Sequence, residues 1–461
     1  MKSRFDSVIA GGLVLAVVFT AAAFGAVETW SISIFELIVA LLTAGWFVSW
    51  AQCREISVDI PPASIPLFGL VLWGAFQTVK LGFGPGPGGA LSLDPGSTRV
   101  SVRVFLFMGL AFLLAANTLN TQKRYRVLAV VLPVLALVMA VFALVQNFAW
   151  NGAYYWIRPS DVRGFGPFAN RDHFAGFMEM LAPIPLSLVL AKWVDRDKRV
   201  LYVFATVIPV IAIFASLSRG GILALGVEAA FLSYWFLRIR VRHTGRNAAK
   251  TRTEYAAQAA IVLGILGAIA IGVLWVGAEP ILNRTAEMVS ELQTAQTSFL
   301  SRQWIWRDTL SMVRSHPVSG VGLGAFRTVF PAFSHSNGAL VVAQAHNDYL
   351  QVLADCGIIG ALLAAAFVAS LIMAIRTALR SRDRLEAGLA LGCSAGLIGM
   401  LIHSLFDFNL QIPSNGLLFL FLGAVVSAIS QGYIRAERDR AMVRAPAKEM
   451  VERSVSRSSD F

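Results

Sequence analysis

Residues 124–147 read RYRVLAVVLPVLALVMAVFALVQN, with no charged side chain after Arg126. An apolar run of this length can cross about 30 Å of hydrocarbon as a helix. Similar runs lie near residues 8–24, 32–50, 63–80, 101–118, 173–191, 200–217, 220–237, 256–276, 349–375, 386–405 and 414–433. The sequence therefore predicts an all-α, polytopic membrane protein with about 12 transmembrane helices.

The overall composition is that of a membrane protein. Of the 461 residues, 56% are hydrophobic and 14% are charged, and the mean hydropathy is +0.66. Soluble domains carry about 25% charged residues. Met1–Arg4 and the apolar run behind it imitate a secretory signal, but a second run follows at once, so we expect a first transmembrane helix. Three scattered cysteines are too few for a disulfide framework.

The basic residues predict the orientation of the chain. With 12 crossings both termini lie on one side, and the loops on that side carry most of the 39 Lys and Arg residues. Basic loops remain in the cytoplasm. We therefore expect residues 1–433 to form a transmembrane domain of an inner membrane and residues 434–461 to form a disordered cytoplasmic tail. The net charge of +12 follows this topology, so we expect membrane lipid and not nucleic acid as a partner.

The outer loops prefer arginine to lysine. Apart from Lys80, their basic residues are arginines 99, 103, 158, 163, 171, 219, 284, 302, 307, 314 and 327. Guanidinium groups bind phosphate oxygens in pairs and keep their charge. This preference indicates a phosphorylated or pyrophosphorylated ligand on the outer face. The alternative is that most of these arginines anchor helices at lipid headgroups.

Two outer loops are long enough to carry chemistry. Residues 148–172 form a medium loop and residues 277–347 a large periplasmic loop, with no comparable cytoplasmic domain. Inside the large loop we expect a helix capped near Thr297 that continues until Pro317. The glycines of residues 320–324 predict a flexible turn behind it.

Ser218-Arg219-Gly220-Gly221 interrupts two apolar runs. An arginine at the centre of a bilayer costs roughly 2.5 to 3.5 kcal/mol on insertion scales, so Arg219 must lie near the outer boundary or face a polar cavity. The next helix begins here and adds the positive end of its dipole. We interpret the segment as an anion site; an interfacial anchor is the alternative.

His346-Asn347-Asp348-Tyr349-Leu350 lies where the large loop re-enters the membrane. Histidine accepts a proton near neutral pH, so His346 is a candidate general base, although a hydrogen-bonded helix cap is also possible. On this topology Arg219 and His346 both fall at the outer boundary and can meet across the helix bundle.

Two further polar segments leave alternatives open. Residues 166–176, which include Arg171 and His173, can bind a sugar or a second phosphate, or can simply start a helix. His403 and Asp407 lie one helical turn apart, and we interpret them as an ion pair at a helix end. HExxH, CxxC, GxSxG and Walker motifs are missing, and the outer carboxylates do not suggest a metal site. We therefore expect neither a metal nor a cofactor.

Together these residues resemble the O-antigen ligases and O-antigen polymerases, the membrane-embedded enzymes that assemble bacterial surface polysaccharides. The resemblance covers residues 150–430, and the first four spans match only in hydrophobicity. It rests on Ser218-Arg219-Gly220 at a helix start, on the outer loop with Arg302, Trp306 and His316–Gly322, and on His346–Leu350.

The resemblance implies a metal-independent glycosyltransferase that takes an undecaprenyl-pyrophosphate-linked glycan as donor at the periplasmic face. It implies that Arg219 and Arg302 stabilise the leaving pyrophosphate and that His346 takes the proton of the acceptor hydroxyl. Pyrophosphate leaves without a general acid, and a single displacement inverts the anomeric centre. We also expect substrate contacts at Arg163, Arg171, His173, Arg307, Asn347 and Tyr349.

The acceptor remains open between two choices. A ligase transfers the glycan to lipid A core, whereas a polymerase transfers it to another lipid-linked glycan. Residues 166–176 and 403–411 resemble those of the ligase-like branch of the family, and we therefore favour the ligase. A transporter of lipid-linked glycan is the rival from another class, and a scaffold is a third reading. The spans carry few charges (Glu36, Glu179, Glu228 and Asp355), which argues against transport.

Overall fold

The computed structural model describes residues 2–53, 56, 58–161, 163–243, 299–335 and 341–458. It confirms an all-α polytopic membrane protein. Within these residues nine helical segments are long and apolar enough to cross a membrane: Arg4–Ala22, Thr29–Cys53, Pro95–Thr118, Gln122–Phe148, Arg171–Leu190, Arg196–Ala215, Asp348–Ala378, Arg384–His403 and Pro413–Met442. The run near 256–276 lies outside the described residues, so the count of about 12 stays a prediction.

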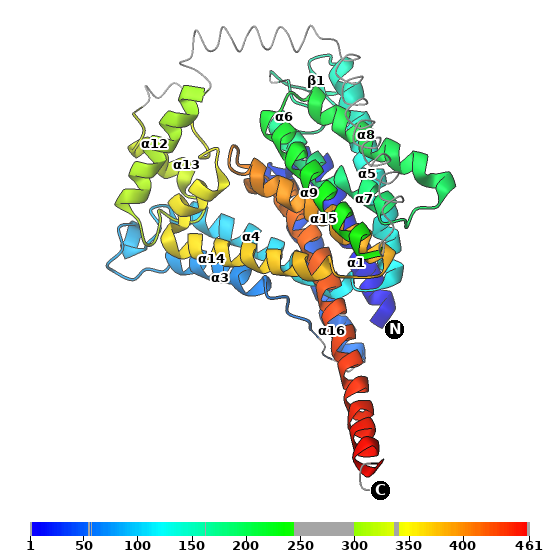
Figure 1. Ribbon diagram of the computed structural model, residues 1–461. Coiled ribbons are helices and arrows are strands. Elements are labelled where there is room, and N and C mark those ends of the chain that lie inside the picture. The colour runs from blue at the N-terminus through cyan, green and yellow to red at the C-terminus, as the bar shows by residue number, and fades with distance from the viewer. Residues whose placement is uncertain are drawn as a thin grey trace.

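The chain forms the following helices: α1 (Lys2–Ala22), α2 (Thr29–Cys53), α3 (Ser64–Gln77), α4 (Pro95–Thr118), α5 (Gln122–Phe148), α6 (Arg171–Leu181), α7 (Pro183–Leu190), α8 (Arg199–Ala215), α9 (Arg219–His243), α12 (Phe299–Ser315), α13 (Phe326–Val329), α14 (Asp348–Ala378), α15 (Arg384–His403) and α16 (Pro413–Ser458). One antiparallel hairpin, β1 (Ala153–Tyr154) with β2 (Arg158–Pro159), lies in the medium loop. In Figure 1 both termini lie below the level of β1 and α12.

Two expected segments differ from the prediction. The run near 63–80 forms α3, whose 14 residues rise about 21 Å and fall short of a full crossing of about 30 Å. Residues 434–458 continue helix α16, although their charged, Ala- and Ser-rich composition predicts a disordered tail. The fold therefore extends the last span by several further turns.

Helix α15 lies at the centre of the bundle and packs on α6, α7, α9 and α16. Its glycines recur every four residues, and a Cβ atom on Gly392 or Gly396 would lie 2.6 or 2.4 Å from the backbone of the facing helix segment. Small residues at this spacing let helix backbones approach closely inside a membrane. This contact brings the start of α6 beside the end of α15.

Two side-chain contacts hold the described part of the 277–347 loop together. Trp306 of α12 donates to the carbonyl of Ala345 at 2.9 Å. His335 donates to the carboxylate of Asp308 twice, through its backbone N–H at 2.9 Å and through Nδ1 at 2.8 Å. In Figure 1 α12 and α13 lie beside the start of α14. Trp306 thereby anchors α12 to the residue before His346.

The glycine turn of residues 320–324 is tightly packed, so the prediction of a flexible turn is wrong. Gly320, Gly322 and Gly324 all have positive φ, and a Cβ on Gly320 would lie 2.4 Å from the α14 backbone. Gln77 of α3 donates to the carbonyl of Ser319 and accepts from the backbone N–H of Leu323. These glycines supply a left-handed backbone and close approach.

Candidate functional site

His346 and Asp407 form a hydrogen-bonded pair between the start of α14 and the turn that follows α15. His346 Nδ1 lies 3.1 Å from Asp407 Oδ1; the Asp407 side chain is 2% exposed, and that of His346 is 30% exposed. Asp407 Oδ1 also accepts the backbone N–H of Phe408 at 2.9 Å. A carboxylate in this place fixes the Nδ1–H tautomer of the imidazole and leaves Nε2 as the basic nitrogen.

The charge of Asp407 is held in place by its surroundings. Burial raises the pKa of this carboxyl, but the hydrogen bond from His346 and the positive charges that His173 and His346 carry at low pH outweigh burial and bring the pKa to about 2. Asp407 is therefore ionised at neutral pH and can stabilise positive charge on the neighbouring imidazole.

The backbone at His346 is held in an unusual conformation. Its φ of 50° lies in the left-handed region, which non-glycine residues seldom adopt. Asn347 next to it caps α14: its side-chain oxygen accepts the N–H of Leu350 at 2.9 Å, and its amide donates to the carbonyl of Leu405 at 3.0 Å. This cap helps to hold the ring of His346 over Asp407.

Two histidine rings lie against one phenylalanine. The ring of His346 meets that of Phe408 edge to face, and so does the ring of His173. In both pairs the centroid of the histidine ring lies 4.8 Å from that of Phe408. His173 is buried near the start of α6, and its carbonyl accepts the side-chain amide of Asn415 at 2.9 Å. The structure thus brings His173 beside the His346–Asp407 pair.

Arg219 lies at the first position of α9, directly after Leu217 in the left-handed region and Ser218. The hydroxyl of Ser218 accepts the N–H of Gly221 at 3.2 Å and caps the helix. Arg219 is exposed, while Gly220 packs against the ring of His403. Since His403 ends α15 four residues before Asp407, the turn with Arg219 lies at the same end of the bundle as His346.

Arg302 and Arg307 belong to α12. Arg302 is four residues before Trp306, so both side chains share one face of the helix. Trp306 contacts the carbonyl of Ala345, which directs this face of α12 toward the start of α14. Arg302 is half-buried, whereas Arg307 is exposed on a different face.

The other expected contact residues are engaged with the protein itself. Arg163 is exposed and donates to the carbonyl of Asn147 at 2.7 Å at the end of α5. Arg171 begins α6 and is half-buried. Tyr349 donates its hydroxyl to the carbonyl of Leu401 at 2.7 Å. Of the expected set, His346 and His173 therefore share one cluster, and Arg163 lies on the medium loop.

His403 and Asp407 do not pair with each other, so the expected ion pair between them is wrong. His403 Nδ1 instead lies 2.9 Å from Glu179 Oε2 of α6, and both side chains are almost fully buried. Tertiary packing overrides the helical spacing, because α6 brings a carboxylate closer to His403 and α14 brings an imidazole closer to Asp407.

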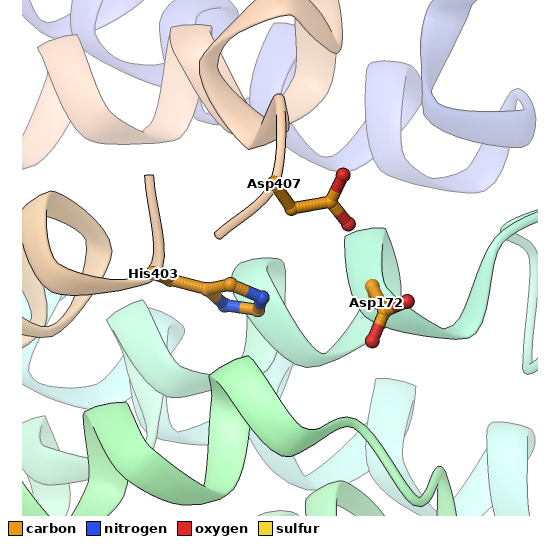
Figure 2. A group of neighbouring side chains, drawn as sticks. All are labelled: Asp172, His403 and Asp407. Carbon is orange, nitrogen blue, oxygen red and sulfur yellow. The ribbon is translucent and has the colours of Figure 1, made fainter. Parts of the chain in front are cut away.

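Asp172, His403 and Asp407 face a common space, with one possible ligand atom from each within 4.8 Å of the others (Figure 2). Metal–ligand bonds of Mg²⁺ or Zn²⁺ are about 2.0–2.2 Å long, so two ligand atoms of one ion lie at most about 4.4 Å apart. The three atoms lie within 4.8 Å of one another, so in the part of the chain that the structure describes these side chains are candidate ligands for a cation.

An apolar cavity opens next to the site. Its volume is about 490 Å³, and Asp348, Ser404 and Gln411 line its polar end. Its walls come from α3, α4, α14 and α16 and include Leu67 and Phe419. Asp348, one of these polar residues, follows His346 by two positions in the chain. A chain-like apolar group attached to a polar head would therefore fit with the head at the site.

Sequence reasoning missed Asp407 as the partner of His346 and Glu179 as the partner of His403. Glu179 lies within the apolar span Arg171–Leu190 and Asp407 lies in the turn after α15, and an unpaired buried charge is costly in both places, so each required a nearby partner. The sequence does not identify that partner, because the pairs lie 61 and 224 positions apart.

Residues 204–365 match a protein family described as O-antigen ligase. The matched segment runs from α8 into α14 and includes Arg219, Arg302 and His346, which confirms the resemblance seen in the sequence. Asp407, His403 and His173 lie outside it. No curated protein matches the chain.

Proposed function

We propose, from the O-antigen ligase match and the His346–Asp407 pair, that this multi-pass membrane protein is a glycosyltransferase of the inner membrane. It moves a glycan from undecaprenyl pyrophosphate to a sugar hydroxyl of lipid A core at the periplasmic face. The match supports an O-antigen ligase type of activity. The donor, the acceptor and the side of the membrane are parts of the proposal.

The observation that carries the proposal is the pairing of a half-exposed imidazole with a buried carboxylate. Asp407 holds the Nδ1–H of His346, so Nε2 takes the proton of the acceptor hydroxyl. The acceptor oxygen forms a bond to the anomeric carbon, and the bond from that carbon to the pyrophosphate oxygen breaks. The lipid pyrophosphate leaves with the electron pair, the anomeric centre inverts, and no metal takes part.

Arg219 and Arg302 are proposed to neutralise the departing pyrophosphate. Arg219 is exposed at the positive end of the α9 dipole, and Arg302 lies on the face of α12 that Trp306 directs toward the site. Guanidinium groups placed before the reaction stabilise the charge that develops on the leaving group. Arg163, Arg171, Arg307 and His173 are proposed to contact the glycan or phosphate.

Asn347 and Tyr349 are proposed to act on the substrate through the loop they hold. Their side chains bind the carbonyls of Leu405 and Leu401, respectively. These bonds fasten the start of α14 to the end of α15, where the apolar cavity begins. The first isoprene units of the donor are proposed to enter that cavity.

Transfer in vitro tests the proposal. Purified protein in lipid is incubated with an undecaprenyl-pyrophosphate glycan, with or without lipid A core, beside the variants His346→Ala and Arg219→Ala. Arg314→Ala is the matched control, because this exposed arginine lies in the last turn of α12. We expect glycan on the core with wild type and Arg314→Ala, and none with the other two variants.

Other outcomes point to the alternatives. Lengthened lipid-linked glycan would identify an O-antigen or exopolysaccharide polymerase. Full activity of His346→Ala would refute the catalytic role. A lipid-linked glycan transporter would tolerate that change but lose function in Glu228→Gln, since Glu228 is a buried carboxyl group inside α9.

A further inference from the structure

The first turn of α9 rests on the ring of His403. A Cβ atom on Gly220 would lie 2.4 Å from both Cδ2 and Nε2 of His403, closer than real Cβ contacts allow. Glycine therefore lets the backbone beside Arg219 touch this ring. Any side chain at position 220 has to push the turn away from α15 or displace the imidazole.

The ring of His403 is fixed from the opposite side. Its Nδ1 pairs with Glu179 at 2.9 Å, and the side chains of His403 and Glu179 are 1% and 0% exposed. Glu179 Oε2 would also lie 3.5 Å from a Cβ on Gly221. The His403–Glu179 pair therefore packs directly against the turn that carries Arg219, and because both side chains are buried and hydrogen-bonded they have little freedom to move.

The backbone of His403 supports the other half of the site. Its carbonyl accepts the N–H groups of Phe406 and Asp407 at 2.8 and 3.2 Å. These bonds shape the turn from which Asp407 reaches His346. One residue therefore contacts the arginine turn with its ring and supports the His346–Asp407 pair with its backbone.

We infer that His403 is a positioning residue, held by Glu179, that sets the separation between the Arg219 turn and the His346–Asp407 pair. This inference rests on the proposed function, in which pyrophosphate binds at Arg219 while the acceptor oxygen meets His346. The pyrophosphate bound at Arg219 and the acceptor oxygen at His346 must both lie next to the same anomeric carbon. A displacement of about 1 Å between such groups costs about 100-fold in rate.

The test compares two glycines of α9. A Cβ on Gly220 meets His403, whereas a Cβ on Gly226 meets nothing within 4 Å. We expect Gly220→Ala to lower transfer per folded protein about 100-fold and Gly226→Ala to change it less than about twofold. The folded fraction is taken from the thermal unfolding transition of each sample, so partial misfolding is separated from a loss of rate.

A compensating change tests the contact itself. His403→Asn replaces the imidazole with a shorter side chain whose amide can donate a hydrogen bond to Glu179. In that background we expect Gly220→Ala to cost less than about threefold, because the two positions are coupled through one contact. Equal costs of Gly220→Ala in both backgrounds, or equal rates of Gly220→Ala and Gly226→Ala, would overturn the inference.

A geometric measurement does not depend on transfer. Leu223 of α9 and Leu405 behind His403 are exposed, so cysteines there can be joined by bifunctional maleimides of graded length in a Cys53→Ser background. We expect Gly220→Ala to shift the preferred reagent length and His403→Asn to restore it. An unchanged preference would refute the positioning role, whereas absence of transfer by wild type alone would refute the proposed function.

Discussion

Replacing Asp407 with asparagine removes one negative charge from beside His346 and keeps the size of the side chain. The two groups are 3.1 Å apart. Unit charges at this separation interact by about 1.3 kcal/mol at the permittivity of water and by about 5 kcal/mol at an effective permittivity of about 20. Because His346 is 30% exposed and Asp407 only 2%, we take about 2 to 3 kcal/mol. This corresponds to a rate loss of about 30- to 160-fold.

The loss should appear in kcat. In the proposed mechanism the positive charge on His346 develops only as it takes the proton of the acceptor, so the carboxylate stabilises the transition state and not the bound substrates. The assay measures initial transfer rates in lipid over a range of donor and acceptor concentrations. We expect KM for both substrates to change less than about threefold.

Two controls accompany this variant. The asparagine oxygen can still accept the N–H of Phe408, so the melting temperature of Asp407→Asn should remain near that of wild type. In a His346→Ala background the same substitution should cause no further loss, because both residues act through one proton transfer. A kcat within twofold of wild type, or an equal additional loss in the His346→Ala background, would refute the reasoning.

Three other outcomes are expected. Trp306→Phe loses the hydrogen bond to the carbonyl of Ala345, worth about 0.5 to 1.5 kcal/mol. Because this bond positions α12 in the proposed site, transfer should slow about 2- to 13-fold; the transfer rate of the purified variant checks this. Gly320→Ala should lower the melting temperature and Gly226→Ala should not, because only the first has positive φ and a backbone neighbour. Asp94 caps α4, and the hydrogen bond from the hydroxyl of Ser97 lowers the pKa of the Asp94 carboxyl. Asp94→Ala should therefore reduce the free energy of unfolding by about 1 kcal/mol above pH about 4, and by less as the pH falls below the lowered pKa. Melting temperatures at pH 7 and pH 3 measure this difference.

The sequence by itself determined the class of fold and the chemistry to look for. Apolar runs such as residues 124–147 admit hardly any structure other than membrane helices, because the backbone must satisfy its hydrogen bonds within the segment. Arg219 and His346 can also be identified as candidate site residues from the sequence, because an ionisable side chain at the end of an apolar run is energetically unfavourable and marks a candidate functional site. These signals are local and need no partner to be recognised.

Only the tertiary structure decided which polar groups meet. Helical spacing favours a pair between His403 and Asp407, yet each finds its partner on another helix, Glu179 and His346, respectively. The glycine turn of residues 320–324 looks flexible in sequence but is packed against α14. Both outcomes depend on close contact between distant segments, and the chain order does not encode those distances. The residues proposed to bear the chemistry are therefore a property of the sequence, whereas their pairing is a property of the packed bundle.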